Sequence, residues 1–527
     1  MPDPSSLPIE LFLYVLDYVA GDAKIPWTLS LVNRGWRSAV TPLVFSRFEF
    51  DGNIERIHKL WLLLVVIAHM PRLGTHVRHL VLTTQKKPDE LPQFALRLYM
   101  SMATFVKSKL AKAGLEHVGD PAMHMARGDN RPMIALILLL CPNIVSLQLH
   151  VATVDPYLDA ILASAVVRDW DGKTPPMRAF QSLRTLHIAT AEAAGYNEQF
   201  VPIINAPTRM NKRRPYLRLP RLEELQIVDA QFGVGLDSLP AEDTALSRLT
   251  IVFMSQIEYI RPVFQYTTKL TQLSLCLPLN GNGEIRDLQV HQSLWEALCP
   301  LKDQLEYLDL YEPELRITPQ SDSDPFPKSQ NFSYCCPLSN FLKLRQLSIT
   351  LLLLAGHQCQ HEPSTKFINH LPPALESFVL YGCSQNWIFE HIRLLKEEIL
   401  AITEAKPLLP LNSILICSSP ETTIPSAPSE HIRGICKEKR IMFTTVDFGL
   451  VYQGGSLTDF ARTTHKSQPD LDDIVYGPRD FDKNHKSWNI IPKDMTAHGR
   501  RGTLDETSFD TAVKPRLDIP RTFIIEQ

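Results

Sequence analysis

The sequence lacks the features that place a chain in a membrane or on nucleic acid. Its longest apolar runs, Leu60 to Ala68 and Met133 to Leu140, are much shorter than the ~20 residues that a membrane-spanning helix needs. The net charge is only −3, so no overall basic field exists to attract nucleic acid or acidic lipid. We therefore expect no membrane and no nucleic acid among its partners.

Paired cysteines and a secretion signal are also missing. The nine cysteines are scattered without a paired spacing, and residues 1–6 are polar and carry no apolar signal segment. Unpaired thiols are typical of a reducing compartment. This pattern favours the cytoplasm, the nucleus or both.

Motifs for catalysis are absent too. The chain has no Gly-x-x-x-x-Gly-Lys phosphate loop, no Gly-x-Ser-x-Gly elbow and no His-Glu-x-x-His zinc motif. The best metal candidate combines His357, Cys359 and His361 with Cys335 and Cys336, but neither cluster has the usual two-residue gap between cysteines. We expect no enzyme activity, no metal and no cofactor.

What the sequence does contain is an internal repeat. The unit apolar-x-x-Leu-x-Leu, in which isoleucine or phenylalanine sometimes replaces leucine, recurs with central residues Leu147, Leu186, Leu225, Leu249, Leu273, Leu308, Leu347, Phe378 and Ile414. Alternation with a period of two predicts a strand in each unit, with one face buried. The segments between units read as helix or loop, and strands that alternate with helices predict a parallel sheet covered by helices.

The domain organisation follows from these patterns. We expect a connecting helix at residues 51–72, a curved α/β solenoid at 73–447 and a largely disordered C-terminal tail at 448–527, where apolar periodicity is lost. A doubly wound α/β domain is the alternative architecture. It would need a phosphate-binding glycine turn, and no strand end offers one.

Residues 1–50 form a separate, apolar segment. Ile9, Phe12, Leu13, Leu16 and Val19 recur at helical spacing, a second short helix is predicted from Pro26, and a third from Trp36 to Val40, where Pro42 should end it. Three short helices cannot bury this much apolar surface in a core of their own. Another part of the chain, or a partner, must cover it.

This segment resembles an F-box. The residues that match the family pattern are Leu7, Pro8, Glu10, Leu11, Val15, Leu16, Leu31, Val32, Arg34, Trp36, Arg37, Pro42 and Leu43, and Gly35 is a departure from good helix propensity. The resemblance implies a small three-helix domain that docks a Skp-type adaptor and, through it, a cullin-based ubiquitin ligase. The adaptor-binding residues that it implies are Leu7, Pro8, Glu10, Leu11, Val15, Leu16, Val32, Trp36, Pro42 and Leu43.

The repeats resemble leucine-rich repeats of irregular length. Residues Leu375 to Cys383 match the fuller family pattern, whereas most other units stop at the second leucine. The residues between the leucines should lie on the exposed face of the sheet and recognise another protein. The candidate target-binding residues are Gln226, Gln272, Tyr307, Asp309, Tyr311 and Gln346.

The sequence therefore leaves two main hypotheses. In the first, the chain is a non-catalytic substrate receptor of a cullin-based ligase, with the repeats holding an unknown target protein. In the second, it is a scaffolding repeat protein whose F-box-like cap recruits no cullin. Co-purification of a cullin would separate them.

Overall fold

The computed structural model describes most of the repeat region and part of the N-terminal segment. The described residues are 11, 14, 28–50, 52, 56–83, 93–115, 118–151, 155–166, 179–190, 216–228, 244–252, 260–276, 288–311, 338–350, 353–354, 370–383, 397, 399–404, 409–418 and 426–447. Five expected adaptor-binding residues, Leu7, Pro8, Glu10, Val15 and Leu16, lie outside these ranges, as do the expected tail at 448–527 and the histidine and cysteine clusters near residues 335 and 359.

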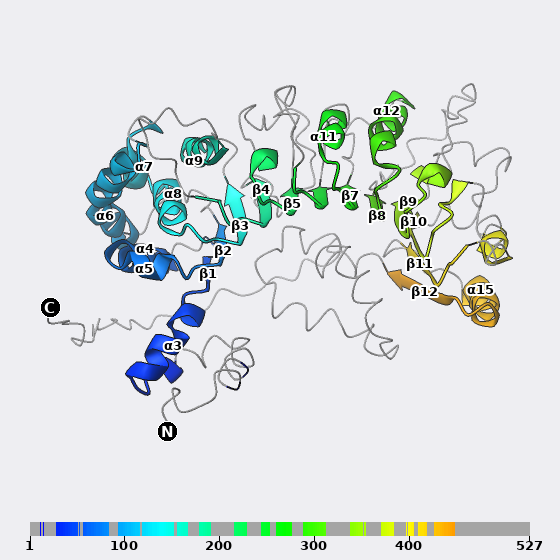
Figure 1. Cartoon of the computed structure of the whole chain (residues 1–527), viewed down its shortest axis with the longest axis horizontal. Helices are drawn as coiled ribbons and strands as arrows, with labels where there is room; N and C mark the ends of the chain where they lie inside the picture. The colour runs from blue at the N-terminus through cyan, green and yellow to red at the C-terminus, as the bar shows by residue number, and fades with distance from the viewer. Residues whose placement is uncertain are drawn as a thin grey trace, which may run out of the picture.

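A single open sheet of twelve strands forms the body of the protein (Figure 1). The strands lie side by side in chain order and every neighbouring pair is parallel. They are β1 (Arg47–Phe50), β2 (His79–Thr83), β3 (Ser146–Val151), β4 (Thr185–Thr190), β5 (Glu224–Val228), β6 (Arg248–Val252), β7 (Gln272–Cys276), β8 (Tyr307–Tyr311), β9 (Gln346–Thr350), β10 (Ser377–Cys383), β11 (Ser413–Ser418) and β12 (Met442–Asp447).

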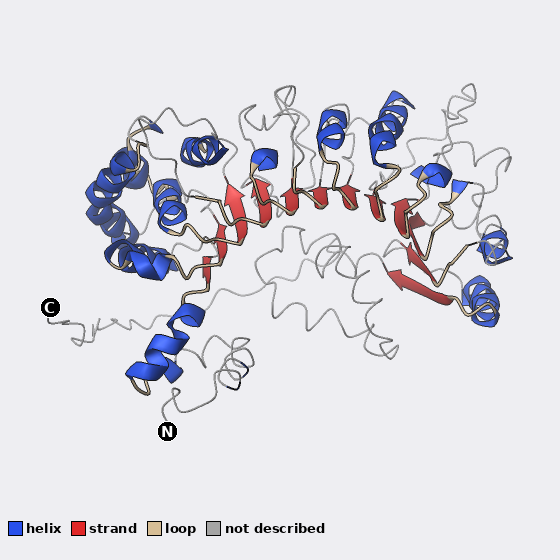
Figure 2. Cartoon of the chain, viewed as in Figure 1, coloured by secondary structure: helices blue, strands red, loops and turns tan. Residues whose placement is uncertain are grey.

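Helices cover the convex side of this curved row of strands (Figure 2). They are α4 (Ile57–His69), α5 (Pro71–Gly74), α6 (Gln93–Lys112), α7 (Pro121–Ala126), α8 (Arg131–Leu140), α9 (Pro156–Val166), α11 (Arg261–Tyr266), α12 (Leu288–Leu298) and α15 (Ser426–Glu438), with short 3-10 turns η4 (Tyr216–Arg218), η7 (Cys299–Leu301) and η8 (Leu338–Asn340). Helix α3 (Arg34–Val44) precedes β1 and lies apart from this layer. The side of the sheet that faces away from this helical layer is called the concave face below.

Two ladders of apolar side chains hold the sheet to its helices. The first runs through Leu80, Leu147, Leu186, Leu225, Leu249, Leu273, Leu308, Leu347, Phe378, Ile414 and Phe443, which are aligned strand to strand and all buried. The second runs two residues further along each strand, from Leu82 to Ile416. Side chains two apart on a strand share a face, so both ladders enter the same core beneath the helices. The expected buried ladder from Leu147 to Leu347 is confirmed.

The backbone repeats one hydrogen-bond arrangement where the strands begin. At each of β2 to β11, two successive N–H groups donate to one carbonyl oxygen just before the preceding strand; the N–H groups of Glu306 and Tyr307, for example, lie 2.8 and 3.0 Å from the Thr271 oxygen. This arrangement fixes the register although central residues of successive repeats are 24 residues apart at Leu249–Leu273 and 39 at Leu147–Leu186. The repeats therefore differ in length mainly in the segments between the strands, and the register at the strand starts stays the same.

Two boundaries differ from the expected ones. The sheet starts at β1 (Arg47–Phe50), which pairs with β2, and not at residue 73. The four residues of β1 alternate only between Phe48 and Phe50, a pattern too short to predict a strand. Helix α3 continues through Pro42 to Val44. The proline removes the donor for the carbonyl of Ser38, but Ser38 is exposed and its carbonyl can bond water, so the helix tolerates Pro42 near its end.

Gly74, at the end of α5, is required by close packing against α8. A Cβ atom on Gly74 would lie 2.2 Å from the Leu140 carbonyl oxygen, which is backbone and cannot rotate away. Gly74→Ala is therefore expected to lower the free energy of unfolding by about 1–3 kcal/mol, measured by urea denaturation. The matched control is Gly434→Ala in α15, where nothing lies within 4 Å of the new atom, and which should stabilise the exposed helix by up to about 1 kcal/mol. Equal midpoints for the two variants would contradict the packing argument.

Candidate functional site

Helix α3 and the turn before it form a small cluster of their own. The Asn33 side chain caps α3 by accepting a hydrogen bond from the Trp36 N–H at 2.8 Å. Trp36 and Val40 are buried, with Leu29, Ala39, Leu43 and Val44 packed around them. Within the described residues this cluster is not continuous with the core under the sheet.

Four large apolar side chains of this segment face solvent. Exposed fractions are 56% for Leu11, 74% for Tyr14, 65% for Leu31 and 39% for Val32. Among the expected adaptor-binding residues that the structure describes, Leu11, Val32 and Pro42 are exposed and Leu43 is half-buried. Trp36 is 7% exposed, so it supports the segment from inside and is not available as a direct contact.

The concave face carries two continuous rows of side chains. The first consists of Ser146, Thr185, Glu224, Arg248, Gln272, Tyr307, Gln346, Ser377 and Ser413, and the second of Gln148, His187, Gln226, Thr250, Ser274, Asp309, Ser348, Val379 and Leu415. Strand pairing thus brings together the expected target-binding residues Gln226, Gln272, Tyr307, Asp309 and Gln346. Tyr311 follows two residues after Asp309 on β8.

The part of this face over β4 to β6 is charged and partly open to solvent. Glu224 lies between His187 and Arg248, with oxygen-to-nitrogen distances of 3.7 Å to His187 Nε2 and 2.5 Å to an Arg248 guanidinium nitrogen. Gln226 and Gln272 are half-buried beside these charges. This surface offers hydrogen-bonding groups without an excess of one charge.

The part over β8 to β11 is buried, contrary to expectation. Tyr307 is 7% exposed and Asp309 only 1%, whereas Tyr311 and Gln346 are half-buried. The Tyr311 ring meets Tyr381 edge-on at 5.6 Å between centroids, next to the buried side chains of Val379 and Cys417. Alternation along a strand gives the face on which a residue lies but not its exposure, which depends on the bulk of its neighbours. The expectation that Tyr307 and Asp309 are exposed is therefore wrong.

Asp309 is the most perturbed acid in this region. The Ser274 hydroxyl donates a hydrogen bond to Asp309 Oδ2 at 2.8 Å. Burial raises the pKa of the Asp309 carboxyl to about 6, although the hydroxyls of Ser274, Tyr381 and Tyr307 act in the opposite direction. The carboxyl group is therefore mostly ionised at pH 7 even though it is buried.

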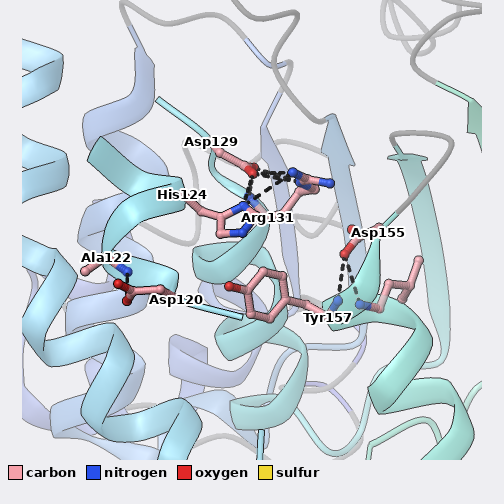
Figure 3. A network of polar contacts seen from close by, with 8 residues as sticks. Asp120, Ala122, His124, Asp129, Arg131, Asp155 and Tyr157 are labelled. Atoms are coloured by element: carbon pink, nitrogen blue, oxygen red, sulfur yellow. Dashed lines mark hydrogen bonds and ion pairs between the residues drawn. The ribbon is translucent and has the colours of Figure 1, made fainter. Parts of the chain in front are cut away.

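A second polar network lies in the helical layer (Figure 3). Asp129 Oδ1 accepts from the backbone N–H and the Nε of Arg131 at 3.0 and 2.9 Å, and Oδ2 lies 2.9 Å from His124 Nδ1. Burial raises the pKa of Asp129, but the hydrogen bonds from Arg131 and His124 outweigh it and hold the pKa below its usual value. Asp155 caps α9 by accepting from the N–H groups of Tyr157 and Leu158, both at 3.1 Å.

This network joins α7, α8 and α9 and has no reactive partner in the described residues. The His124 ring meets the buried Tyr157 ring edge-on at 5.7 Å, and no described serine, cysteine or threonine hydrogen-bonds to His124. Within the described residues, the contacts of the Asp129–His124 pair hold α7 against the start of α8. Sequence reasoning missed it; the only local signal is Asp129 two residues before Arg131 at a helix start with Pro132.

The described ranges hold few other candidate sites. They contain no group of three or more histidine, cysteine, aspartate or glutamate side chains that could hold a metal ion. None of the helices within these ranges is long and apolar enough to cross a membrane. No protein-family model matches the chain, and no curated protein is significantly similar to it.

Proposed function

We propose that the chain is a substrate receptor of a cullin-based ubiquitin ligase, in which the N-terminal segment binds a Skp-type adaptor. The observation that carries this proposal is the exposure of Leu11, Tyr14, Leu31 and Val32 in a segment whose described residues place Trp36 and Val40 in a small cluster separate from the main core. Several large exposed apolar side chains in one short segment favour a docking site. The F-box resemblance of the same residues supports an adaptor as its partner.

The target protein is proposed to bind the concave face of the sheet. This face is long and regular in register, and the helices from α4 to α15 that the structure describes lie on the other side of the sheet (Figure 2). Gln226, Gln272 and Gln346 supply half-buried amides at successive strands, and Tyr311 adds an aromatic ring. Such mixed polar and aromatic surfaces are typical of protein interfaces. The chain itself would act by holding the target close to the ligase.

The adaptor proposal is tested with a double substitution, Leu31→Ala with Val32→Ala, in the full chain. Removing two exposed apolar side chains from the proposed interface should weaken binding of a purified Skp-type adaptor by about 30-fold or more, measured by calorimetric titration. The same variant should lose co-purification of the cullin. Circular dichroism should show the sheet unchanged, because neither residue contributes to the main core.

The matched control removes exposed apolar groups elsewhere. Leu62 on α4 is 49% exposed and Met100 on α6 is 55% exposed, so Leu62→Ala with Met100→Ala deletes comparable surface outside the N-terminal segment. Adaptor affinity should be unchanged in this control. The proposal is refuted if the adaptor fails to bind the unmodified chain, or if the Leu31 and Val32 variant binds as tightly as the control.

A further inference from the structure

Asp309 is a buried carboxylate without a counter-ion in the described chain. Asp309 is 1% exposed, and its Oδ2 accepts a hydrogen bond from the Ser274 hydroxyl at 2.8 Å. Oδ1 is buried and accepts no hydrogen bond of normal geometry. Among the described residues, no lysine, arginine or histidine forms an ion pair with it. Buried carboxylates are normally paired with a cation, whereas the side chains that act on Asp309 within the described residues are the neutral hydroxyls of Ser274, Tyr381 and Tyr307.

The surroundings of Asp309 suit a positively charged group. Ser348 is aligned with Asp309 on the neighbouring strand, and the hydroxyls of Tyr307 and Tyr381 act on the carboxyl group. Hydroxyl oxygens can accept hydrogen bonds, and tyrosine rings attract cations through their faces. Ser274 and Tyr311 beside it are partly exposed, so the acid lies just beneath the surface of the concave face.

We propose that Asp309 is a recognition residue that receives a lysine side chain of the target protein. An ammonium group is a point charge with three donors, and it can bond the open Oδ1 and neighbouring hydroxyl oxygens together. An arginine fork would need both carboxylate oxygens, and Ser274 already occupies one. The inference rests on the proposed function in one respect, which is that the concave face captures a protein target.

The test uses the full chain and a small probe, Nα-acetyl-lysine methylamide, in a titration followed by nuclear magnetic resonance. A ligand of this size that fills the site should bind with a dissociation constant of about 1 mM. The matched norleucine compound, which has the same carbon chain without the ammonium group, should bind at least tenfold more weakly. The arginine compound should fall between them.

Two variants then locate the charge that is responsible. Asp309→Asn keeps the shape of the side chain and should weaken lysine binding at least tenfold. Asp303→Asn makes the same change of charge on an exposed residue of the same repeat, and it should leave binding unchanged. Circular dichroism of both variants establishes that they fold.

The titrations of the unmodified chain are decisive by themselves, even if a variant fails to fold. Equal binding of the lysine and norleucine compounds, or no binding of either, would overturn it whatever the variants do. Lysine binding that survives Asp309→Asn would also overturn it. Loss of adaptor binding with intact lysine recognition would refute only the ligase proposal, because the probe titration contains no adaptor.

Discussion

Replacing Leu273 with aspartate is expected to unfold the centre of the sheet. Leu273 is fully buried and is aligned with Leu249 on one side and Leu308 on the other, so the new carboxyl group would have no water and no partner. The lost apolar burial and the unpaired polar group together should cost more than about 4 kcal/mol of unfolding free energy. Thermal unfolding followed by circular dichroism should show a large fall in melting temperature, or no folded signal.

The control for this prediction is the same substitution on the surface. Leu342 is 62% exposed, and Leu342→Asp should change stability by no more than about 0.5 kcal/mol. Because each repeat contacts mainly its neighbours, protease digestion of Leu273→Asp should cut first near β6 to β8 and leave the end repeats longer. Comparable stability for the two variants would mean that the ladder does not hold the sheet together.

Asp309 should make the protein less stable as pH rises from about 4 to 6. Its pKa of about 6 in the folded chain lies above the ordinary value of 3.8, so the folded state keeps a proton that the unfolded state has released. The free energy of unfolding therefore falls as pH rises through this window and is level above it. The loss should be about 3 kcal/mol for this one group.

Asp309→Asn removes this titration and provides the measurement. Urea unfolding at several pH values from about 4 to 7 should give a larger fall in unfolding free energy for the unmodified chain than for the variant. Asp129 does not interfere, because its pKa is lowered; its stabilising contribution is complete above its unfolded pKa and is lost only as pH falls through its folded pKa. Identical slopes for both proteins would show that Asp309 is not buried in its charged form.

The sheet could be predicted from the sequence because its signal is repeated. Nine units with apolar residues at fixed offsets indicated parallel strands, and the central leucines from Leu147 to Leu347 are aligned as expected. β1 was missed because its pairing with β2 depends on a partner strand that no local pattern in four residues reveals. The end of α3 was misplaced at Pro42 because the sequence does not show that the carbonyl of Ser38, which loses its donor, lies on an exposed residue.

For the candidate site, the sequence predicted the face of the sheet on which the residues lie but not how deeply they are buried. The alternation correctly placed Gln226, Gln272, Asp309 and Gln346 on one face. It could not show that tyrosines from β8 and β10 meet and leave Asp309 buried, because that contact joins residues about 70 positions apart. The contact between His124 and Tyr157 was missed for a similar reason, since it joins α7 to α9 across 33 positions of the sequence.

The order of the strands has a consequence for how the chain folds. Every strand pairs only with the strands before and after it in the sequence, and paired residues are between 24 positions apart, as in Arg248 and Gln272, and 67 apart, as in His79 and Ser146. In a chain of 527 residues these separations correspond to a relative contact order of roughly 0.07, which is low for a parallel sheet. Assembly can therefore start at any well-formed pair and spread in both directions, and during synthesis the N-terminal repeats can pair before the last ones have been made.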